Sequence, residues 1–203
     1  MISKKQLENR ILNACENVMA AEAELTEIDS KFGDADHGLT MHKIADAVKA
    51  SVQGSDGSIK EMLDDAAMAV MGLNGGSAVP LWNTWLDGMQ EGAPEAEEID
   101  TKGLQAMFAA AFEALDDMSG AKVGDKTMMD AVIPASKAIA EYAGDSEEEL
   151  FAVAAEAALA GAENSKNFVS KFGRAKSYGT KTIGTPDAGA VSMSKFYEVL
   201  AKA

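Results

Sequence analysis

Residues 3–28 read SKKQLENRILNACENVMAAEAELTEI, and this stretch has the period of an amphipathic helix. Apolar side chains return every three or four positions, which places them on one face of a helix. Ser3 and Gln6 have the spacing of a capping box, so the helix is expected to begin there. The series is Ile11, Cys15, Val18, Glu22, Leu25 and Ile28, with one polar member. The sequence predicts one helix that extends to Ile28.

The same period continues along the rest of the chain and predicts an all-α fold. No run alternates apolar and polar residues rich in Val, Ile and Thr, so we expect no sheet. No internal repeat or low-complexity tract divides the chain, so residues 1–203 are predicted to form a single domain. Seven further helices are expected: after Gly38, over about 58–71, 81–90, 101–118, 127–142 and 146–172, and from 189 to the end.

The composition limits the classes of ligand. The 203 residues carry a formal net charge of −15, with a pI near 4.5. Such a surface repels a phosphate backbone, so nucleic-acid binding is not expected, and a small anion would need a metal cation or a local basic patch. The single cysteine, Cys15, excludes an intrachain disulfide. With no leader pattern and no run of about 18 apolar residues, we expect a cytoplasmic protein that does not enter a membrane.

Four of the expected loops are rich in Gly, Asp, Ser or Thr, and they follow the first, third, fifth and seventh helices. If successive helices run up and down, alternate helices end at the same end of the bundle, so these four loops meet there. They cover residues 29–40, 74–80, 119–127 and 173–189. This end of the bundle is therefore the predicted place of a functional site.

The first of these loops contains three carboxylates within eight residues. Asp34 and Asp36 alternate around Ala35, so in an extended stretch they point the same way, and Asp29 lies on the last turn of the preceding helix. Hard divalent cations take oxygen ligands, and carboxylates supply the compensating charge. A cup of three carboxylates that binds a metal is one interpretation. The alternative is structural, with Asp36 capping the next helix between turn glycines.

The residues of this loop fit the patterns of other metal sites less well. An EF-hand that begins at Asp34 would need a glutamate where Ala45 stands. Zinc is not expected, because the two histidines, His37 and His42, have no cysteine partner nearby. For His37 the sequence leaves two roles undecided, a structural hydrogen bond and a contact with a ligand.

The other loops have glycines and basic side chains that are compatible with binding an anion. Residues 74–80 read NGGSAVP, whose glycines either let backbone amides approach phosphate or end a helix in a turn. Residues 164–186 carry five basic side chains and no acidic one, a local reversal of charge. Their glycines and serines predict a mobile loop over the second half, which either closes over a polyphosphate or is simply solvated.

Four motifs occur in order: Gly33-Asp-Ala-Asp-His-Gly38 with the upstream Asp29, Gly124-Asp-Lys-Thr-Met128, Gly173-Arg-Ala175, and Ile183-Gly-Thr-Pro-Asp-Ala-Gly-Ala190. Together they resemble the nucleotide-binding L subunit of bacterial dihydroxyacetone kinases, over essentially the whole chain. The resemblance implies an antiparallel eight-helix barrel with the nucleotide site at one end. It also implies a kinase subunit that passes the terminal phosphate of the nucleotide to a ketose.

The resemblance implies specific ligands for this chain. Asp29, Asp34 and Asp36 would hold two Mg²⁺ ions, and Arg174 would act in catalysis by adding positive charge. Residues expected around ADP or ATP are His37, Gly38, Leu39, Thr40, Gly76, Ser77, Ala78, Gly120, Thr127, Met128, Arg174, Asp187, Ala188 and Gly189.

The resemblance also implies partners. The ketose would be bound on a separate K subunit, and a phosphohistidine protein would rephosphorylate bound ADP; the chain would form a homodimer or a hetero-oligomer with the K subunit. Departures from the family pattern occur at Thr40, Lys176, the 75–80 loop (Gly75-Gly-Ser-Ala-Val-Pro80) and the Asp187-Ala-Gly-Ala190 turn. They leave open the phosphate contacts, the identity of the ketose (erythrulose is one alternative) and a purely nucleotide-sensing role.

Overall fold

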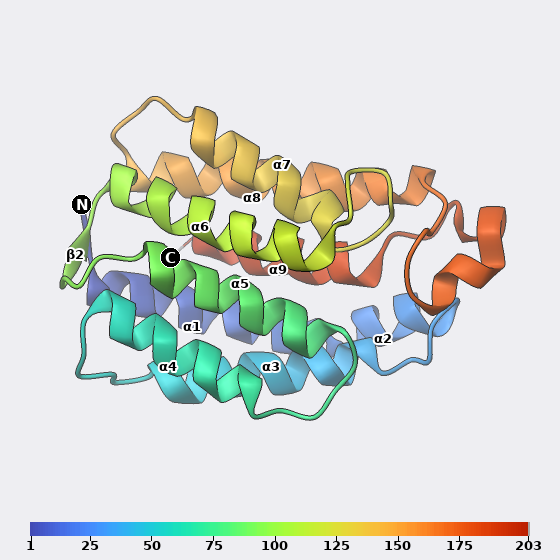
Figure 1. Ribbon diagram of the computed structural model, residues 1–203, viewed down its shortest axis with the longest axis horizontal. Coiled ribbons are helices and arrows are strands. Elements are labelled where there is room, and N and C mark those ends of the chain that lie inside the picture. Colours follow the sequence, from blue (N-terminus) through green and yellow to red (C-terminus); the bar gives the residue numbers. More distant parts are fainter. Residues whose placement is uncertain (203) are drawn as a thin grey trace.

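The computed structural model describes residues 1–202 and is mostly helical (Figure 1). Its elements are β1 (Ile2–Ser3), α1 (Lys4–Ala20), α2 (Glu22–Ser30), α3 (His37–Val52), α4 (Ile59–Met71), α5 (Ala78–Gly92), β2 (Glu98–Ile99), α6 (Thr101–Ser119), α7 (Met129–Glu141), α8 (Glu147–Asn164), the 3₁₀ segments η1 (Ser165–Asn167) and η2 (Arg174–Thr182), and α9 (Ala188–Leu200).

The helices form a closed ring. α1 packs on α3, and each following helix packs on the next, through α4, α5, α6, α7 and α8 to α9, which returns to α1. With α1 and α2 counted as one interrupted helix, the part of the chain that the structure describes contains eight α-helices arranged as an antiparallel barrel. The predicted fold class is confirmed.

Aromatic side chains fill the middle of the barrel. Trp85 and Tyr197 are fully buried, with ring centroids 5.9 Å apart. Trp82 and Phe196 each meet Trp85 edge-on at 5.5 Å, and Phe108 packs against Tyr197. Such edge-to-face contacts add to the burial of apolar area. The packed core holds the helix ends, and therefore the loops, in defined positions.

Two of the predicted helices differ most from the observed ones. The expected first helix is interrupted at Ala21, which separates α1 from α2. The expected helix over 146–172 ends at Asn164, and Ser165 begins the 3₁₀ segment η1. The hydroxyl of Ser165 donates to the carbonyl of Ala162 at 2.6 Å, a local bond that competes with continuation of the helix.

The expectation of no sheet was wrong in detail. β1 pairs with β2 in antiparallel register, with Ile2 opposite Ile99. Each strand has only two residues, too few to show an alternating pattern in the sequence.

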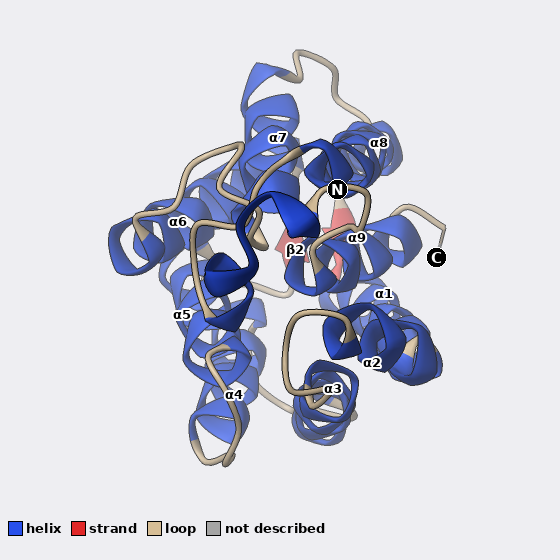
Figure 2. Cartoon of the chain, turned by 90° about the vertical axis from the view of Figure 1, so that its right-hand side faces the viewer, coloured by secondary structure: helices blue, strands red, loops and turns tan. Residues whose placement is uncertain are grey.

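The loops divide between two ends. The predicted site loops all lie at the end that carries η2, at the right of Figure 1, whereas β1 and β2 lie at the opposite end. Figure 2 looks onto the first of these ends, with η2 and the loops in front of the helices. Within residues 1–202 no helix is both long and apolar enough to cross a membrane.

Candidate functional site

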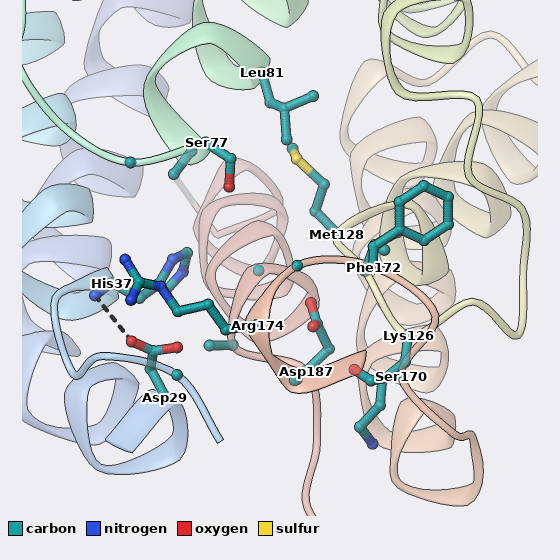
Figure 3. A pocket seen from close by; sticks show the side chains of 18 of the residues that line it. Asp29, His37, Ser77, Leu81, Lys126, Met128, Ser170, Phe172, Arg174 and Asp187 are labelled. Atoms are coloured by element: carbon teal, nitrogen blue, oxygen red, sulfur yellow. Dashed lines mark hydrogen bonds between the residues drawn. The ribbon is translucent and has the colours of Figure 1, made fainter. Parts of the chain in front are cut away.

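A cavity of about 610 Å³ opens at the end of the barrel where the four polar loops meet. Each of these loops contributes side chains to its wall, among them Asp29, Ser77, Lys126 and Arg174 (Figure 3). The volume lies within the range of small-molecule sites in proteins. The up-and-down alternation of the helices therefore brings together loops far apart in the sequence.

The three aspartates of the first loop converge in this cavity. One carboxylate oxygen from each of Asp29, Asp34 and Asp36 lies within 4.8 Å of the others. The expected extended conformation was wrong, because Ala35 has a left-handed backbone with φ of 62°. Gly33 packs so closely on Asp29 that an added Cβ would lie 2.0 Å from its Oδ1. A tight turn, and not an extended strand, brings the carboxylates together.

The capping role expected as the alternative for Asp36 belongs to Asp29. Oδ2 of Asp29 accepts hydrogen bonds from the backbone amides of Asp36 at 3.2 Å and His37 at 3.4 Å. The side chain of Asp36 makes no capping bond to α3. Partial desolvation and the charges of Asp34 and Asp29 raise the pKa of Asp36. A cation placed among these oxygens would relieve this repulsion, as expected for a magnesium-type donor set.

The basic segment lies directly over this acidic cluster. Nη2 of Arg174 is 2.6 Å from Oδ2 of Asp34, although the guanidinium is largely exposed. The ring of Tyr178 packs on Phe32 of the acidic loop, with centroids 5.2 Å apart. The segment predicted to be a mobile loop contains the 3₁₀ segment η2, with Gly179 in a left-handed conformation between two turns. Arg174 is therefore placed to meet negative charge at the mouth of the cavity.

The role of His37 was left open by the sequence. Its Nε2 lies 3.2 Å from the hydroxyl of Ser192 on α9, and burial lowers the pKa of the imidazole. The neutral ring is thus tied to the barrel by a hydrogen bond, while it also lines the cavity.

Helix N-termini form another part of the wall. α5 begins after Ser77, which makes no side-chain capping bond. The first amides of a helix favour anions when no side chain satisfies them. α7 and α9 differ, because Oγ1 of Thr127 accepts from the amide of Met129 at 3.2 Å and Oδ2 of Asp187 accepts from the amide of Ala190 at 2.8 Å. Burial raises the pKa of the Asp187 carboxyl to about 7.

The side of the cavity away from the aspartates is apolar. Leu81, Trp82, Met118, Met128 and Phe172 line it. Figure 3 shows Leu81 and Met128 on this side and Asp29 with Arg174 on the other. A ligand with a charged part and a flat apolar part matches this division.

Residues 31–202 match the DAK2 domain family. The chain belongs to this family. It is 30% identical to the PEP-dependent dihydroxyacetone kinase, ADP-binding subunit DhaL, of Escherichia coli K12, over 100% of this chain and 98% of that subunit. It is 32% identical to the L-erythrulose kinase of Pectobacterium atrosepticum, over 93% of this chain and 33% of that kinase. The DAK2 chain thus spans about a third of the erythrulose kinases that it matches.

A solved structure has the same fold. The dihydroxyacetone kinase from C. freundii, in complex with AMP-PNP and Mg²⁺, superposes with a TM-score of 0.70 and 21% identity. The match covers 97% of this chain and 33% of that one.

Most residues that the sequence indicated as ligands line the cavity of this DAK2 domain. They are Asp29, Asp34, Asp36, His37, Thr40, Gly76, Ser77, Ala78, Thr127, Met128, Arg174, Asp187, Ala188 and Gly189. Three others do not line it. Gly38 packs against α2, where a Cβ would lie 2.1 Å from Oγ1 of Thr26. Leu39 is 49% exposed, and Gly120 ends α6 with φ of 62°.

Several lining residues were missed by the sequence analysis. Leu81, Trp82 and Phe172 were not singled out, because their periodicity does not distinguish a cavity wall from the core. Lys126 also lines the cavity. Its place inside the Gly124–Met128 motif was a signal that could have singled it out.

Proposed function

We propose that this DAK2 domain is the nucleotide-binding phosphotransfer subunit of a dihydroxyacetone (glycerone) kinase. It would hold ADP or ATP and pass the terminal phosphate to a ketose on a partner K subunit. The observation that carries the proposal is the arrangement of three carboxylates and Arg174 at one side of a cavity whose other side is apolar. A magnesium-bound polyphosphate fits the charged side, and an adenine ring fits the apolar side.

Magnesium fits the donor set. Asp29, Asp34 and Asp36 offer six carboxylate oxygens, and Mg²⁺ is usually bound by one or two carboxylates together with waters and substrate phosphates. Three carboxylates are therefore enough for the two ions that we propose. When bound, the ions would neutralise the charge of the phosphates in a protein of net charge −15.

The chain's own groups would position the nucleotide. Backbone amides at the start of α5, where Ser77 makes no side-chain capping bond, would donate to phosphate oxygens. Arg174 would leave Asp34 for the transferring phosphoryl group and stabilise the charge that develops on it. His37 is engaged by Ser192, so we place the base that accepts the ketose proton on the partner.

The names of the relatives support the proposed partners. The near full-length match to the E. coli ADP-binding subunit supports an association with a K subunit and recharging of bound ADP by a phosphohistidine protein that draws on phosphoenolpyruvate. The erythrulose kinases support erythrulose as an alternative substrate.

The metal cluster can be tested by binding. Asp34→Ala should abolish magnesium-dependent binding of ADP in titration calorimetry, because it removes one of three cation ligands. Asp64→Ala is the matched control, since Asp64 is exposed on α4 outside the cavity. Binding by the Asp34 variant at the wild-type affinity would refute the proposed cluster.

Transfer is a separate measurement. The protein, loaded with ADP, is mixed with a phosphohistidine donor and a K subunit that carries either dihydroxyacetone or erythrulose. Formation of the ketose phosphate would identify the substrate. ADP binding with no turnover on either ketose would instead assign a nucleotide-sensing role.

A further inference from the structure

Lys126 is unusual for a residue in a loop. It is 4% exposed, and its backbone is left-handed, with φ of 61°. A left-handed conformation and a buried ammonium each disfavour the folded chain for an L-residue such as lysine. Burial accordingly lowers the pKa of Lys126, against the charges of Asp187 and Asp130. Such features persist only where surrounding contacts stabilise them.

The contacts of Lys126 are backbone carbonyls. Its ammonium donates to the carbonyl of Ser165 at 2.6 Å and to that of Thr185. In Figure 3 its side chain runs away from Asp29 and Arg174. The lysine of this Gly-Asp-Lys-Thr motif therefore does not reach toward the charged side of the cavity as the lysine of a phosphate-binding loop does.

These carbonyls belong to the segment between α8 and α9. Ser165 is fully buried, and its hydroxyl accepts from the amide of Asp187 at 2.9 Å. Lys126 thus joins both ends of the 165–187 segment to the loop before α7. Asp130, in the first turn of α7, fixes the backbone of that loop by accepting from the amides of Gly124 at 2.6 Å and Thr127 at 2.8 Å.

The side chain of Lys126 links two walls of the cavity. Thr127 and Met128 follow Lys126 directly, and Asp187 to Gly189 follow Thr185. These two stretches adjoin, since a Cβ added at Gly189 would lie 3.2 Å from Cβ of Met128, and both belong to the proposed nucleotide contacts. We propose that Lys126 is a positioning residue for the nucleotide, which holds the 127–128 and 187–189 walls at the spacing that ADP requires. This inference rests on the proposed nucleotide binding.

Lys4 provides a matched control at the opposite end of the barrel. It is 8% exposed, and its ammonium also donates to two carbonyls, those of Ser55 and Gly57, in the loop between α3 and α4. It lies outside the cavity. Lys4 and Lys126 therefore make the same type of contact, and only Lys126 makes it beside the site.

The test compares Lys126→Met with Lys4→Met. Both variants keep the aliphatic stem and lose the ammonium, so both should unfold at a lower temperature than the wild type. Calorimetric titration with ADP and Mg²⁺, below every unfolding transition, should show a Kd about tenfold higher for Lys126→Met and within about twofold of wild type for Lys4→Met. Lys126→Arg, which keeps the charge and the donors, should recover most of the affinity.

The possible results distinguish failure of this inference from failure of the proposed function. A Kd for Lys126→Met within about twofold of wild type, or an equal loss in both methionine variants, would overturn the inference. If Lys126→Met does not fold, Ser165→Ala decides, because it removes the hydroxyl that holds the Asp187 amide. That variant keeps the Ser165 carbonyl that Lys126 contacts and loosens the 187–189 wall directly, so it should bind ADP about threefold more weakly. Wild-type affinity would show that the position of this wall does not set ADP affinity, which would overturn the inference. Wild-type protein that fails to bind ADP would overturn the proposed function itself.

Discussion

The two ends of the barrel treat their helix N-termini differently. The helices that begin at the end with β1 and β2 (α1, α4, α6 and α8) are all capped by a side chain, from Ser3, Ser58, Asp100 and Ser146. Of those that begin at the cavity end (α3, α5, α7 and α9), α9 alone is capped by its own N-cap side chain, that of Asp187. At the cavity end, Asp29 accepts from the first amides of α3 and Thr127 from the first amide of α7, both from outside the helix. Among these four described helices, α5 is therefore the one whose first amides meet no capping side chain and are left for a ligand.

Backbone strain follows the same division. Among residues 1–202, the non-glycine residues with positive φ are Ala35 and Lys126, and both lie in cavity loops. Conformations of this kind gather where a site requires a special geometry, and the rest of the fold must stabilise them. The loops at the cavity end therefore contain strained residues that lower local stability, whereas the opposite end has no such residue among the described ones.

Arg174 offers the largest expected effect. Arg174→Ala should lower the rate of phosphotransfer about 100-fold, because a donor aimed at developing charge is lost. The free energy of unfolding should change by less than about 0.5 kcal/mol, since the guanidinium is largely exposed. The measurements are a coupled kinase assay and urea denaturation.

A control variant tests whether the loss of any exposed basic side chain lowers the rate of phosphotransfer. Lys137 is exposed on α7 and pairs with Glu141 at 3.8 Å. Lys137→Ala should leave both the rate and the stability unchanged. A similar loss of rate in both variants would remove the assigned role of Arg174.

The capping contrast has a smaller effect and a direct test. Ser58→Ala should destabilise the protein by about 1 kcal/mol with no change in ADP affinity, because the hydroxyl accepts from the amide of Glu61. Ser77→Ala should change the free energy of unfolding by less than about 0.5 kcal/mol, since Ser77 makes no capping bond. It should weaken ADP binding, because Ser77 lines the cavity. Thermal unfolding and calorimetry on both variants are sufficient. Equal losses of stability would break the comparison between the two ends.

The last expected effect is a pH dependence with opposite signs at the two ends. Burial raises the pKa of Asp187 from 3.8 to about 7, so between these values the folded carboxyl is protonated while the unfolded one is ionised. Unfolding then releases a proton, and stability should fall as pH rises from about 4 to about 7, by at most about 1.4 kcal/mol per pH unit, and level off above.

Glu61 at the opposite end gives the reverse sign. Hydrogen bonds from the amide and hydroxyl of Ser58 lower the pKa of its carboxyl, so its contribution to stability is lost as pH falls through that pKa. Asp187→Asn should flatten the fall between pH 4 and pH 7, whereas Glu61→Gln should leave it in place. Urea denaturation across this pH range measures both, and an unchanged slope in Asp187→Asn would show that another group is responsible.

The site was partly predictable. The clustering of Asp29, Asp34 and Asp36 followed from their spacing, and the meeting of the four loops followed from counting helices, because both depend on local order along the chain. The turn at Ala35 was not predicted, since alanine carries no sequence signal for a left-handed conformation. Lys126 was missed because carbonyls 39 and 59 residues away decide where its ammonium lies.

By itself, the sequence determined the helices and the character of the loops. Periodicity, capping boxes and glycines act within a few residues, so they can be read along the chain. Only the tertiary structure decided that α9 closes the ring on α1, that Arg174 meets Asp34, and that Lys126 joins two walls of one cavity. Those contacts depend on how buried surfaces pack over long sequence separations, and local preferences do not encode that packing.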